Sequence, residues 1–381
     1  MKNPHLRAPA LLLALLLALL LMLTLAACGG DDTETMAPVE PDKLSGQEEA
    51  QEEGVLNPLT GLREEASYTL ERPIAVMINN LKQATPPRGM SAYDGAFEVL
   101  AEGEINRIIA LFYDYESIPE IGSVRSARDY YFKLVRPLDP IVLHYGGSDA
   151  AYIYIKQNKL DTLNGMESNV DSLLYWRDQQ RIKSAGYEHS VFTSGEKVRE
   201  AVEQLERRTE TEQTEPFFRF RGEEEEARAP GSLPGVTITV PFSHYIEPVF
   251  EYDAQKGCYL RSQYGAPYVD ETTGQQIEVD NLFIVFAEHR AVGDEAGHIE
   301  VVTTGSGQGL YFSKGAGCAV NWSKQGDADF FTFTDEAGQE LEVNRGRMWI
   351  CVVAPNCKVS YTDPAQQTEA QEQADGETAN A

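Results

Sequence analysis

The apolar pattern of this chain changes once, near residue 232, and that change limits the folds open to it. Before it, short apolar runs such as residues 73–79 and 105–113 are typical of buried strands and alternate with helical patterns. After it, residues 235–361 form short runs rich in β-branched and aromatic residues, separated by turn formers. We therefore predict an α+β protein, with an amino-terminal α/β domain on a mixed sheet and a carboxyl-terminal, β-rich antiparallel domain.

Capping signals place the helices of the first domain. Ser91 with Asp94 fits a capping box and predicts a helix over residues 92–103. A further helix is predicted over residues 194–208. Residues 209–230, with a run of four glutamates, are predicted to be an insertion or linker.

The stretch from residue 121 to 155 is expected to be the centre of the first domain. Ser126 with Asp129 predicts a helix that runs to about residue 136, where prolines end it. Residues 141–145 form the next strand. A Gly-Gly turn and a serine follow: Gly146 and Gly147 end the strand, and Ser148 caps a helix.

The first 28 residues have the layout of an export signal. A short basic head precedes an uncharged apolar stretch, and the small residues Leu-Ala-Ala lead to Cys28. This end resembles a bacterial lipobox, which implies that residues 1–27 are a signal peptide and that Cys28 carries lipid. The protein would then be extracytoplasmic, anchored to the outer face of the cell membrane. The alternative is a secreted protein with a chance cysteine.

The chain is strongly acidic, with a formal net charge of −28. Nine acids and one lysine in residues 29–54 predict that 28–54 are a lipidated cysteine and an extended tether, and residues 363–381 are predicted to be a disordered acidic tail. The two predicted domains, 55–231 and 232–362, still carry −17. This charge argues against nucleic acid as a partner.

Four cysteines fall in the second domain, and their spacing fits neither a Cys-x-x-Cys motif nor a zinc site. They are Cys258, Cys318, Cys351 and Cys357. Export permits a disulfide, and an anaerobic source would leave free thiols, so both states stay open. No metal or cofactor is predicted.

A ligand site is predicted where the central stretch meets the sheet. Arg125 and Arg128 flank a helix start, where guanidinium groups and free N–H groups would bind phosphate or carboxylate. Alternatively, each arginine pairs with a carboxylate of this acidic domain. The predicted ligand-binding residues are Arg125, Ser126, Arg128, His144, Gly146, Gly147 and Ser148.

Catalysis is the second hypothesis. Glu98 and Glu102 lie four residues apart on one face of the predicted helix, where they would act as an acid and a base, and His144 is a possible base. A solvated face, ion pairs to arginine and a structural histidine explain the same residues. Seven tyrosines within 42 residues could stack on sugar or peptide, or simply fill the core.

Several segments resemble the YerB-like lipoprotein family. They are NPLTGL at 57–62, RPIAVMINN at 72–80, AFEVLAEGEINRIIALF at 96–112, IGSVRSAR at 121–128, LHYGGS at 143–148, DNLFIV at 280–285, GSGQGLYF at 305–312 and Trp322. The resemblance implies a lipoprotein with an α/β and a β-rich domain, and it implies no reaction. The chain departs from the family pattern at Glu188-His189-Ser190, which puts a role for His189 in doubt.

The first hypothesis is therefore a lipoprotein that binds an anionic or saccharide envelope ligand, or an envelope protein, through a crevice of the α/β domain. The alternative is a hydrolase or transferase that acts on a cell-envelope polymer. Two carboxylates facing each other in an open cleft, or His144 within hydrogen-bond reach of a serine, would favour the enzyme.

Overall fold

The computed structural model describes residues 54–64, 71–211, 213 and 215–363. The predicted signal peptide, Cys28, and all but the last residue of the tether and the first of the tail lie outside these residues. The described residues all belong to one compact unit. Among the described residues, no helix has the length and apolar character needed to cross a membrane.

One large mixed sheet runs through the described unit. In spatial order its strands are β11 (Leu233–Pro234), β21 (Ala316–Lys324), β20 (Gly305–Ser313), β17 (Asn281–Phe286), β23 (Met348–Val353), β4 (Gly95–Leu100), β5 (Asn106–Phe112), β3 (Ile74–Asn79), β7 (Ile141–His144) and β8 (Thr162–Asn164), with β22 (Thr332–Thr334) added on β21. Four of its strand pairs are parallel: β17–β23, β23–β4, β3–β7 and β7–β8.

Four smaller sheets complete the described unit. A six-stranded sheet contains β15 (Ala266–Pro267), β14 (Cys258–Gln263), β13 (Val249–Asp253), β12 (Thr237–Thr239), β24 (Ser360–Thr362) and β16 (Glu278–Val279). The others are β6 (Ile121–Gly122) with β10 (Val191–Thr193) and β9 (Trp176–Arg177), β1 (Val55–Leu56) with β2 (Arg63–Glu64), and β18 (His289–Ala291) with β19 (Ile299–Val301).

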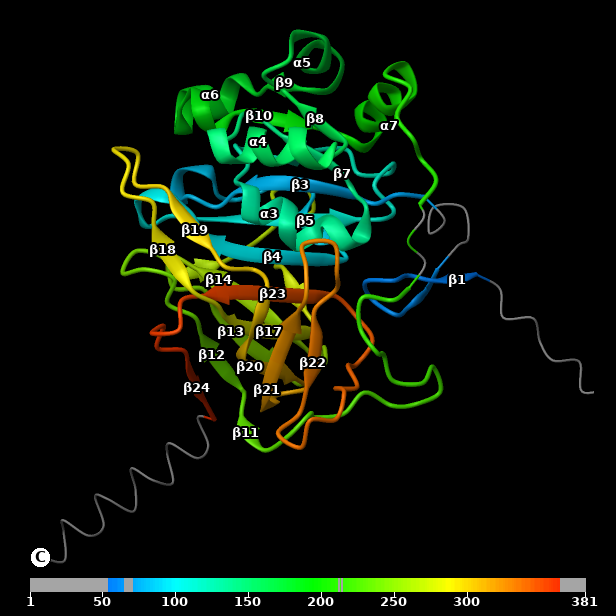
Figure 1. Ribbon diagram of the computed structural model, residues 1–381, viewed down its shortest axis with the longest axis vertical. Coiled ribbons are helices and arrows are strands. Elements are labelled where there is room, and N and C mark those ends of the chain that lie inside the picture. Colours follow the sequence, from blue (N-terminus) through cyan, green and yellow to red (C-terminus); the bar gives the residue numbers. More distant parts are fainter. Residues whose placement is uncertain (1–53, 65–70, 212, 214, 364–381) are drawn as a thin grey trace, which may run out of the picture. The chain divides into compact units, whose positions relative to one another are not determined.

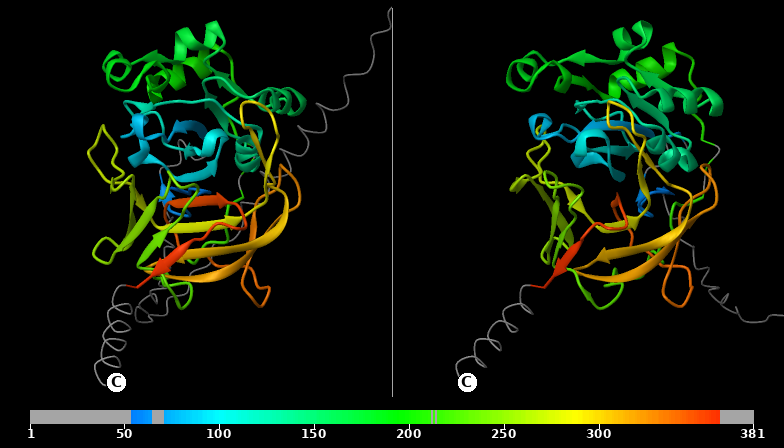
Figure 2. Two further views of the ribbon diagram at one scale, coloured as in Figure 1. Left: turned by 90° about the vertical axis from the view of Figure 1, so that its left-hand side faces the viewer. Right: turned by 60° about the vertical axis from the view of Figure 1, so that its left-hand side comes forward.

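The helices of the described residues all lie before residue 205. They are α3 (Asp129–Val135), α4 (Asp149–Asn158), α5 (Ser168–Leu174), α6 (Gln179–Ala185) and α7 (Gly195–Gln204), with short 3₁₀ turns η1 (Lys82–Ala84), η2 (Met90–Ala92), η3 (Glu102–Glu104), η4 (Arg136–Leu138) and η5 (Tyr187–His189). In Figure 1 the green helices α5 to α7 lie at the top of the unit and strands β11, β21 and β24 lie at its lower end; Figure 2 shows the same unit from two further sides.

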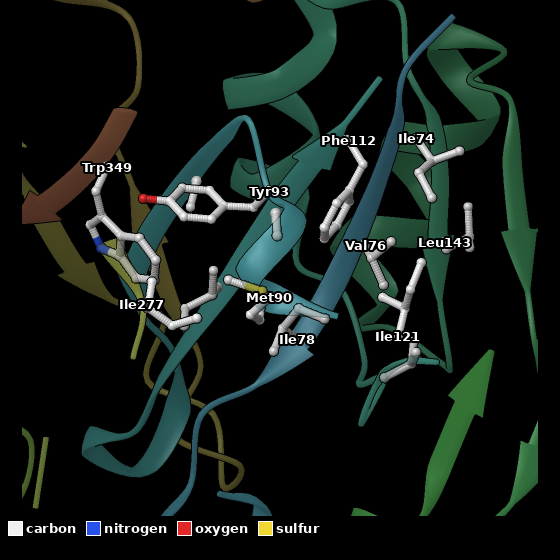
Figure 3. Packing of buried hydrophobic residues seen from close by; sticks show 14 of the residues in the cluster. Ile74, Val76, Ile78, Met90, Tyr93, Phe112, Ile121, Leu143, Ile277 and Trp349 are labelled. Carbon is white, nitrogen blue, oxygen red and sulfur yellow. The ribbon is translucent and has the colours of Figure 1, made fainter. Parts of the chain in front are cut away.

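The central strands of the main sheet are buried on both faces. Every residue of β5 is buried. Consecutive residues point to opposite faces of the sheet, so Ile108 belongs to one apolar cluster and Ile109 to the other. Helices α5 and α7 and the six-stranded sheet contribute to the first cluster; α3 and α4 contribute to the second. Figure 3 shows part of the first cluster, where the ring of Tyr93 meets Trp349 edge-on at 5.5 Å.

These observations confirm the predicted α+β class and several local elements. The strands predicted at 73–79, 105–113 and 141–145 are β3, β5 and β7, and Ser148 caps α4 by accepting a hydrogen bond from the amide of Ala151. The carboxyl half is antiparallel except where β17 pairs with β23.

Two predicted helix starts are wrong. Residues 92–103 contain strand β4, because burial on both faces favours an extended segment whatever the capping signal at Ser91 suggests. Helix α3 begins at Asp129 rather than at Ser126, whose hydroxyl donates to the carbonyl of Tyr145 instead of capping a helix.

The predicted division near residue 232 does not interrupt the main sheet. Strand β23 of the carboxyl half pairs along its length with β4 of the amino half, and Figure 1 shows the two side by side. Within residues 209–230, Phe217 and Phe218 are buried against the sheet, where Phe218 stacks on Phe283 at 4.8 Å. Residues 217–218 of this predicted linker are therefore packed into the core, whereas residues 222–229 are exposed.

Candidate functional site

The segments predicted to form the ligand site do meet at the carboxyl edge of β3 and β7. The amide of Tyr145 donates to the carbonyl of Arg125, the amide of Ala127 donates to that of Gly146, and the amide of Ser148 donates to that of Ala127. Residues 125–128 thus run alongside 145–148. Whether the predicted side chains bind a ligand there stays a prediction.

Arg128 at this edge is committed to a carboxylate. Its Nη2 lies 2.6 Å from Oε1 of Glu102, and Nη2 of Arg107 lies 2.5 Å from the same oxygen. Burial favours the neutral carboxyl, but the two guanidinium groups outweigh it and lower the pKa of Glu102 to about 2. Glu102 is therefore an ion-pair partner that stays charged, not a candidate general acid.

Arg125 is less firmly held. Its Nη2 lies 3.3 Å from Oε2 of Glu188, whose side chain is 63% exposed, and its Nε is buried without a hydrogen-bond partner among the described residues. Burial, reinforced by the charge of Arg107, lowers the pKa of the Arg125 guanidinium. Of the predicted pair, only Arg125 has a buried side-chain nitrogen without a hydrogen-bond partner among the described residues.

His144 is an interior residue. Its Nδ1 lies 2.8 Å from the carbonyl oxygen of Gly146, its ring meets Phe132 edge-on at 5.7 Å, and it is fully buried. Burial lowers its pKa to about 4, so the ring is neutral and Nδ1–H donates. Nε2 is buried without a partner in the described part of the chain.

Glu98 also lies in the interior, contrary to the prediction that it shares a helical face with Glu102. It is fully buried on β4, where its carboxylate pairs with Nη2 of Arg261 at 2.9 Å and accepts from Nε1 of Trp349 at 2.8 Å. Its remaining donors are the amides of Asn80 and Asn106. Glu98 therefore links β4 to β14 and faces no described cavity.

The other predicted groups have structural surroundings. Five of the seven tyrosines are buried, which is the core-packing alternative: Tyr113, Tyr115, Tyr130, Tyr131 and Tyr154. Nδ1 of His189 accepts from the amide of Asn79 at 2.9 Å. The cysteines at 258, 318, 351 and 357 are free thiols.

A cavity that the sequence did not predict lies at the opposite, amino edge of the same parallel strands. Its volume is about 460 Å³. Its walls come from the residues before β3, β7 and β8, from the end of α3 and from the segment after α7. The lining residues are Arg72, Phe132, Val135, Arg136, Asp139, Pro140, Val142, Asn158, Lys159, Leu160, Asp161, Arg207, Arg208 and Ala328. We call it the amino-edge cavity.

The two carboxylates of the amino-edge cavity are shared among three arginines. Arg72 is buried and pairs with Asp161 at 2.7 Å and with Asp139 at 3.3 Å. Arg208 lies 2.6 Å from Asp139, and Arg207 lies 3.5 Å from Asp161. Both acids are therefore already occupied by cationic partners.

Two further cations line this cavity without an ion pair in the described residues. Nη1 of Arg136 donates to Oδ1 of Asn158 at 2.8 Å and lies 3.3 Å from the hydroxyl of Tyr154. Lys159 follows α4 in a left-handed backbone conformation and is exposed. Nε of Arg207 is buried without a hydrogen-bond partner in the same set of residues.

The lining charges thus give five cations against two carboxylates, a surplus of three positive charges. A second cavity, of about 560 Å³, has three arginines and three carboxylates and no surplus: Arg219, Arg221, Arg228, Asp335, Glu340 and Glu342. Apolar side chains such as Phe132 and Leu160 complete the amino-edge lining. A small organic anion is the ligand that this combination suits.

Sequence reasoning missed this cavity because it looked only at the carboxyl edge, where α/β proteins commonly bind ligands. The contributing cations come from four separate stretches, at 72, 136, 159 and 207–208. The Arg207-Arg208 pair directly after a helix, in an otherwise acidic chain, is the one local signal that could have drawn attention to it.

Two family models match the chain in order. The model described as "Protein of unknown function (DUF3048) N-terminal domain" matches residues 59–208, and "Protein of unknown function (DUF3048) C-terminal domain" matches residues 238–350. The Bacillus subtilis (strain 168) protein "Putative lipoprotein YerB" is 32% identical over 297 residues, which are 78% of this chain and 85% of that protein. The crystal structure of YerB from Bacillus subtilis superposes with a TM-score of 0.69 at 28% identity, covering 80% of this chain and 98% of the other.

Proposed function

This chain belongs to the DUF3048 family, and on that premise we propose that it is a lipid-anchored extracytoplasmic protein that binds a small organic phosphate in its amino-edge cavity. The Leu-Ala-Ala-Cys sequence ending at Cys28, and a relative named as a lipoprotein, support the anchor. The cavity supports the ligand class.

The observation that carries the ligand proposal is the surplus of three positive charges in a region of net charge −17. Charges spread over the surface are screened beyond about 8–10 Å at physiological ionic strength, so the cavity's own cations dominate what a ligand inside it experiences. The overall negative charge would repel an anionic membrane surface, which favours a soluble anion over a lipid headgroup.

Phosphate fits these donors better than a neutral ligand does. Guanidinium groups bind phosphate oxygens through paired N–H donors, and Arg136 and Arg207 contribute such groups to the lining. The apolar residues of the lining would accommodate the organic part of the ligand. A volume of about 460 Å³ lies within the range of small-molecule sites.

The test is calorimetric titration of the full chain in mild detergent with benzyl phosphate, and with benzyl alcohol as the uncharged analogue. We expect benzyl phosphate to bind and the alcohol not to bind. Vesicles containing phosphatidic acid form a separate arm, and binding to vesicles without binding of benzyl phosphate would move the proposal to a lipid headgroup.

Matched variants locate the site. Lys159→Gln with Arg207→Gln removes two cavity cations and should weaken benzyl phosphate binding by about tenfold or more. Lys156→Gln with Arg199→Gln makes the same change of charge on α4 and α7, at residues outside the lining, and should leave affinity within about twofold. Equal losses in both double variants would show that only general charge matters and would overturn the assignment.

A further inference from the structure

A buried lysine from the carboxyl half holds a loop that forms one wall of the amino-edge cavity. Lys324 is the last residue of β21 and is fully buried. Its Nζ donates to the carbonyl oxygens of Gly326 at 2.7 Å, Asp327 at 2.9 Å and Asp329. The three N–H donors of an ammonium group are thereby all used, on three carbonyls of one short loop.

This loop, residues 325–329, reaches the cavity in two ways. Ala328 is part of the lining. Asp327 accepts a hydrogen bond from the hydroxyl of Tyr154 at 3.0 Å, and Nη1 of Arg136 lies 3.3 Å from the same hydroxyl. A continuous series of contacts therefore joins Lys324, the loop, Tyr154 and the cavity cation Arg136.

We infer that Lys324 is a positioning residue for the amino-edge cavity: its ammonium group fixes the 325–329 loop, and through Tyr154 the loop fixes Arg136 for the anion. The inference rests on the proposed function for its ligand. It assigns a residue of the carboxyl half to a site whose lining residues, apart from Ala328, all come from residues 72–208.

The protonation state of Lys324 decides how firmly the loop is held. A neutral amine has two N–H donors and a lone pair, so one of the three carbonyls would lose its donor and face the lone pair. Burial lowers the pKa of Lys324 to about 8; the charges of Asp327 and Asp329 act in the opposite direction, and that of Arg136 acts with burial. The ring of Phe331, 5.9 Å away, completes its charged and aromatic surroundings.

Affinity for the anion should therefore fall as pH rises through about 8. The cavity arginines stay charged throughout this range, and a phosphate monoester is already a dianion above pH 7. Neither group can produce a transition near pH 8. A midpoint there would point to Lys324.

The experiment titrates the full chain with benzyl phosphate between pH 7 and 9.5. The wild type should lose about fivefold in affinity across this range, the equivalent of one hydrogen bond of ordinary strength. Lys324→Met should bind weakly at every pH, with no transition. Wild-type affinity and a wild-type pH profile in Lys324→Met would overturn the inference.

Two further measurements keep the test decisive. Tyr154→Phe removes the hydroxyl between Asp327 and Arg136 and keeps Lys324. The folded variant should also bind benzyl phosphate weakly, without the change in affinity near pH 8. A pH profile equal to that of the wild type would refute the proposed contact series. Hydrogen exchange of the backbone amides of residues 325–329 measures how firmly the loop is held, and it needs no ligand. Loop protection that depends on Lys324, together with no binding of benzyl phosphate, would refute the proposed function and leave only the anchoring.

Discussion

The two edges of the parallel strands β3, β7 and β8 use arginine in opposite ways. At the carboxyl edge, Arg107 and Arg128 meet on Glu102 and are almost fully buried, so their charges are neutralised inside the protein. At the amino edge, five cations surround open space with only two carboxylates. The comparison teaches that the balance of charge around a cavity, rather than the presence of arginine, marks a candidate anion site.

The same comparison separates residues that stabilise the fold from residues available to a ligand. A buried arginine needs its carboxylate, because an unpaired buried charge is costly. An exposed lysine such as Lys159 contributes little to stability and keeps its donors for a partner. Stability and binding should therefore respond to different substitutions at the two edges.

The largest effect should come from Glu102→Ala at the carboxyl edge. It leaves Arg107 and Arg128, whose side chains are 3% and 9% exposed, without their shared carboxylate. We expect a loss of about 3–5 kcal/mol in the free energy of unfolding, measured by urea denaturation. Glu188→Ala, which removes an exposed partner, should cost less than about 1 kcal/mol, and similar losses for the two variants would erase the distinction.

Acid should also lower the free energy of unfolding, because it protonates Glu102 at the carboxyl edge. The folded pKa of Glu102, about 2, lies below its ordinary value of 4.5, so its stabilising contribution is complete above pH 4.5 and is lost as pH falls toward 2. Allowing for partial exposure, we expect about 1–2 kcal/mol. Urea unfolding of the wild type and Glu102→Gln at pH 6 and pH 3 measures it: the difference between the two proteins should shrink at pH 3, and a constant difference would contradict the pairing.

Salt should lower the affinity for an anion at the amino edge. Raising NaCl from about 0.05 to 0.5 M should weaken benzyl phosphate binding by about three- to tenfold, because the cavity is open to solvent and its cations become screened. Calorimetric titration at several salt concentrations measures this effect. Salt-independent affinity would mean that the bound group is not recognised by charge.

The smallest effect should come from Arg125→Gln. Its guanidinium is paired with an exposed carboxylate and lies outside the amino-edge lining, so benzyl phosphate affinity should change by less than about twofold. A tenfold loss in the same titration would place the anion at the carboxyl edge, where the sequence predicted it.

Much of the local structure could be predicted because it depends on neighbouring residues. Continuous apolar runs identified β3 and β5, and Ser148 was correctly predicted to cap α4. Strand β4 was missed because Ser91 and Asp94 suggested a helix cap just before its sequence, GAFEVL, whose glutamate also suits a helix surface. The partner that makes this glutamate an interior residue, Arg261, lies 163 positions away and could not be inferred from a local pattern.

The site was harder to predict than the fold. The sequence correctly brought residues 125–128 beside 145–148, but it could not show that Glu102 occupies Arg128. The amino-edge cavity combines residues from Arg72 to Ala328, and no spacing along the chain connects them. Only the folded arrangement shows which cations share a carboxylate and which have none.

The most direct test of anion binding in the amino-edge cavity is diffraction from crystals soaked in tungstate, a heavy oxyanion that resembles phosphate. We expect an anomalous difference peak inside the amino-edge cavity, within contact of Arg136, Lys159 or Arg207, and its loss in the Lys159→Gln, Arg207→Gln double variant. A peak beside Arg125 at the carboxyl edge, with none among the cavity cations, would contradict it.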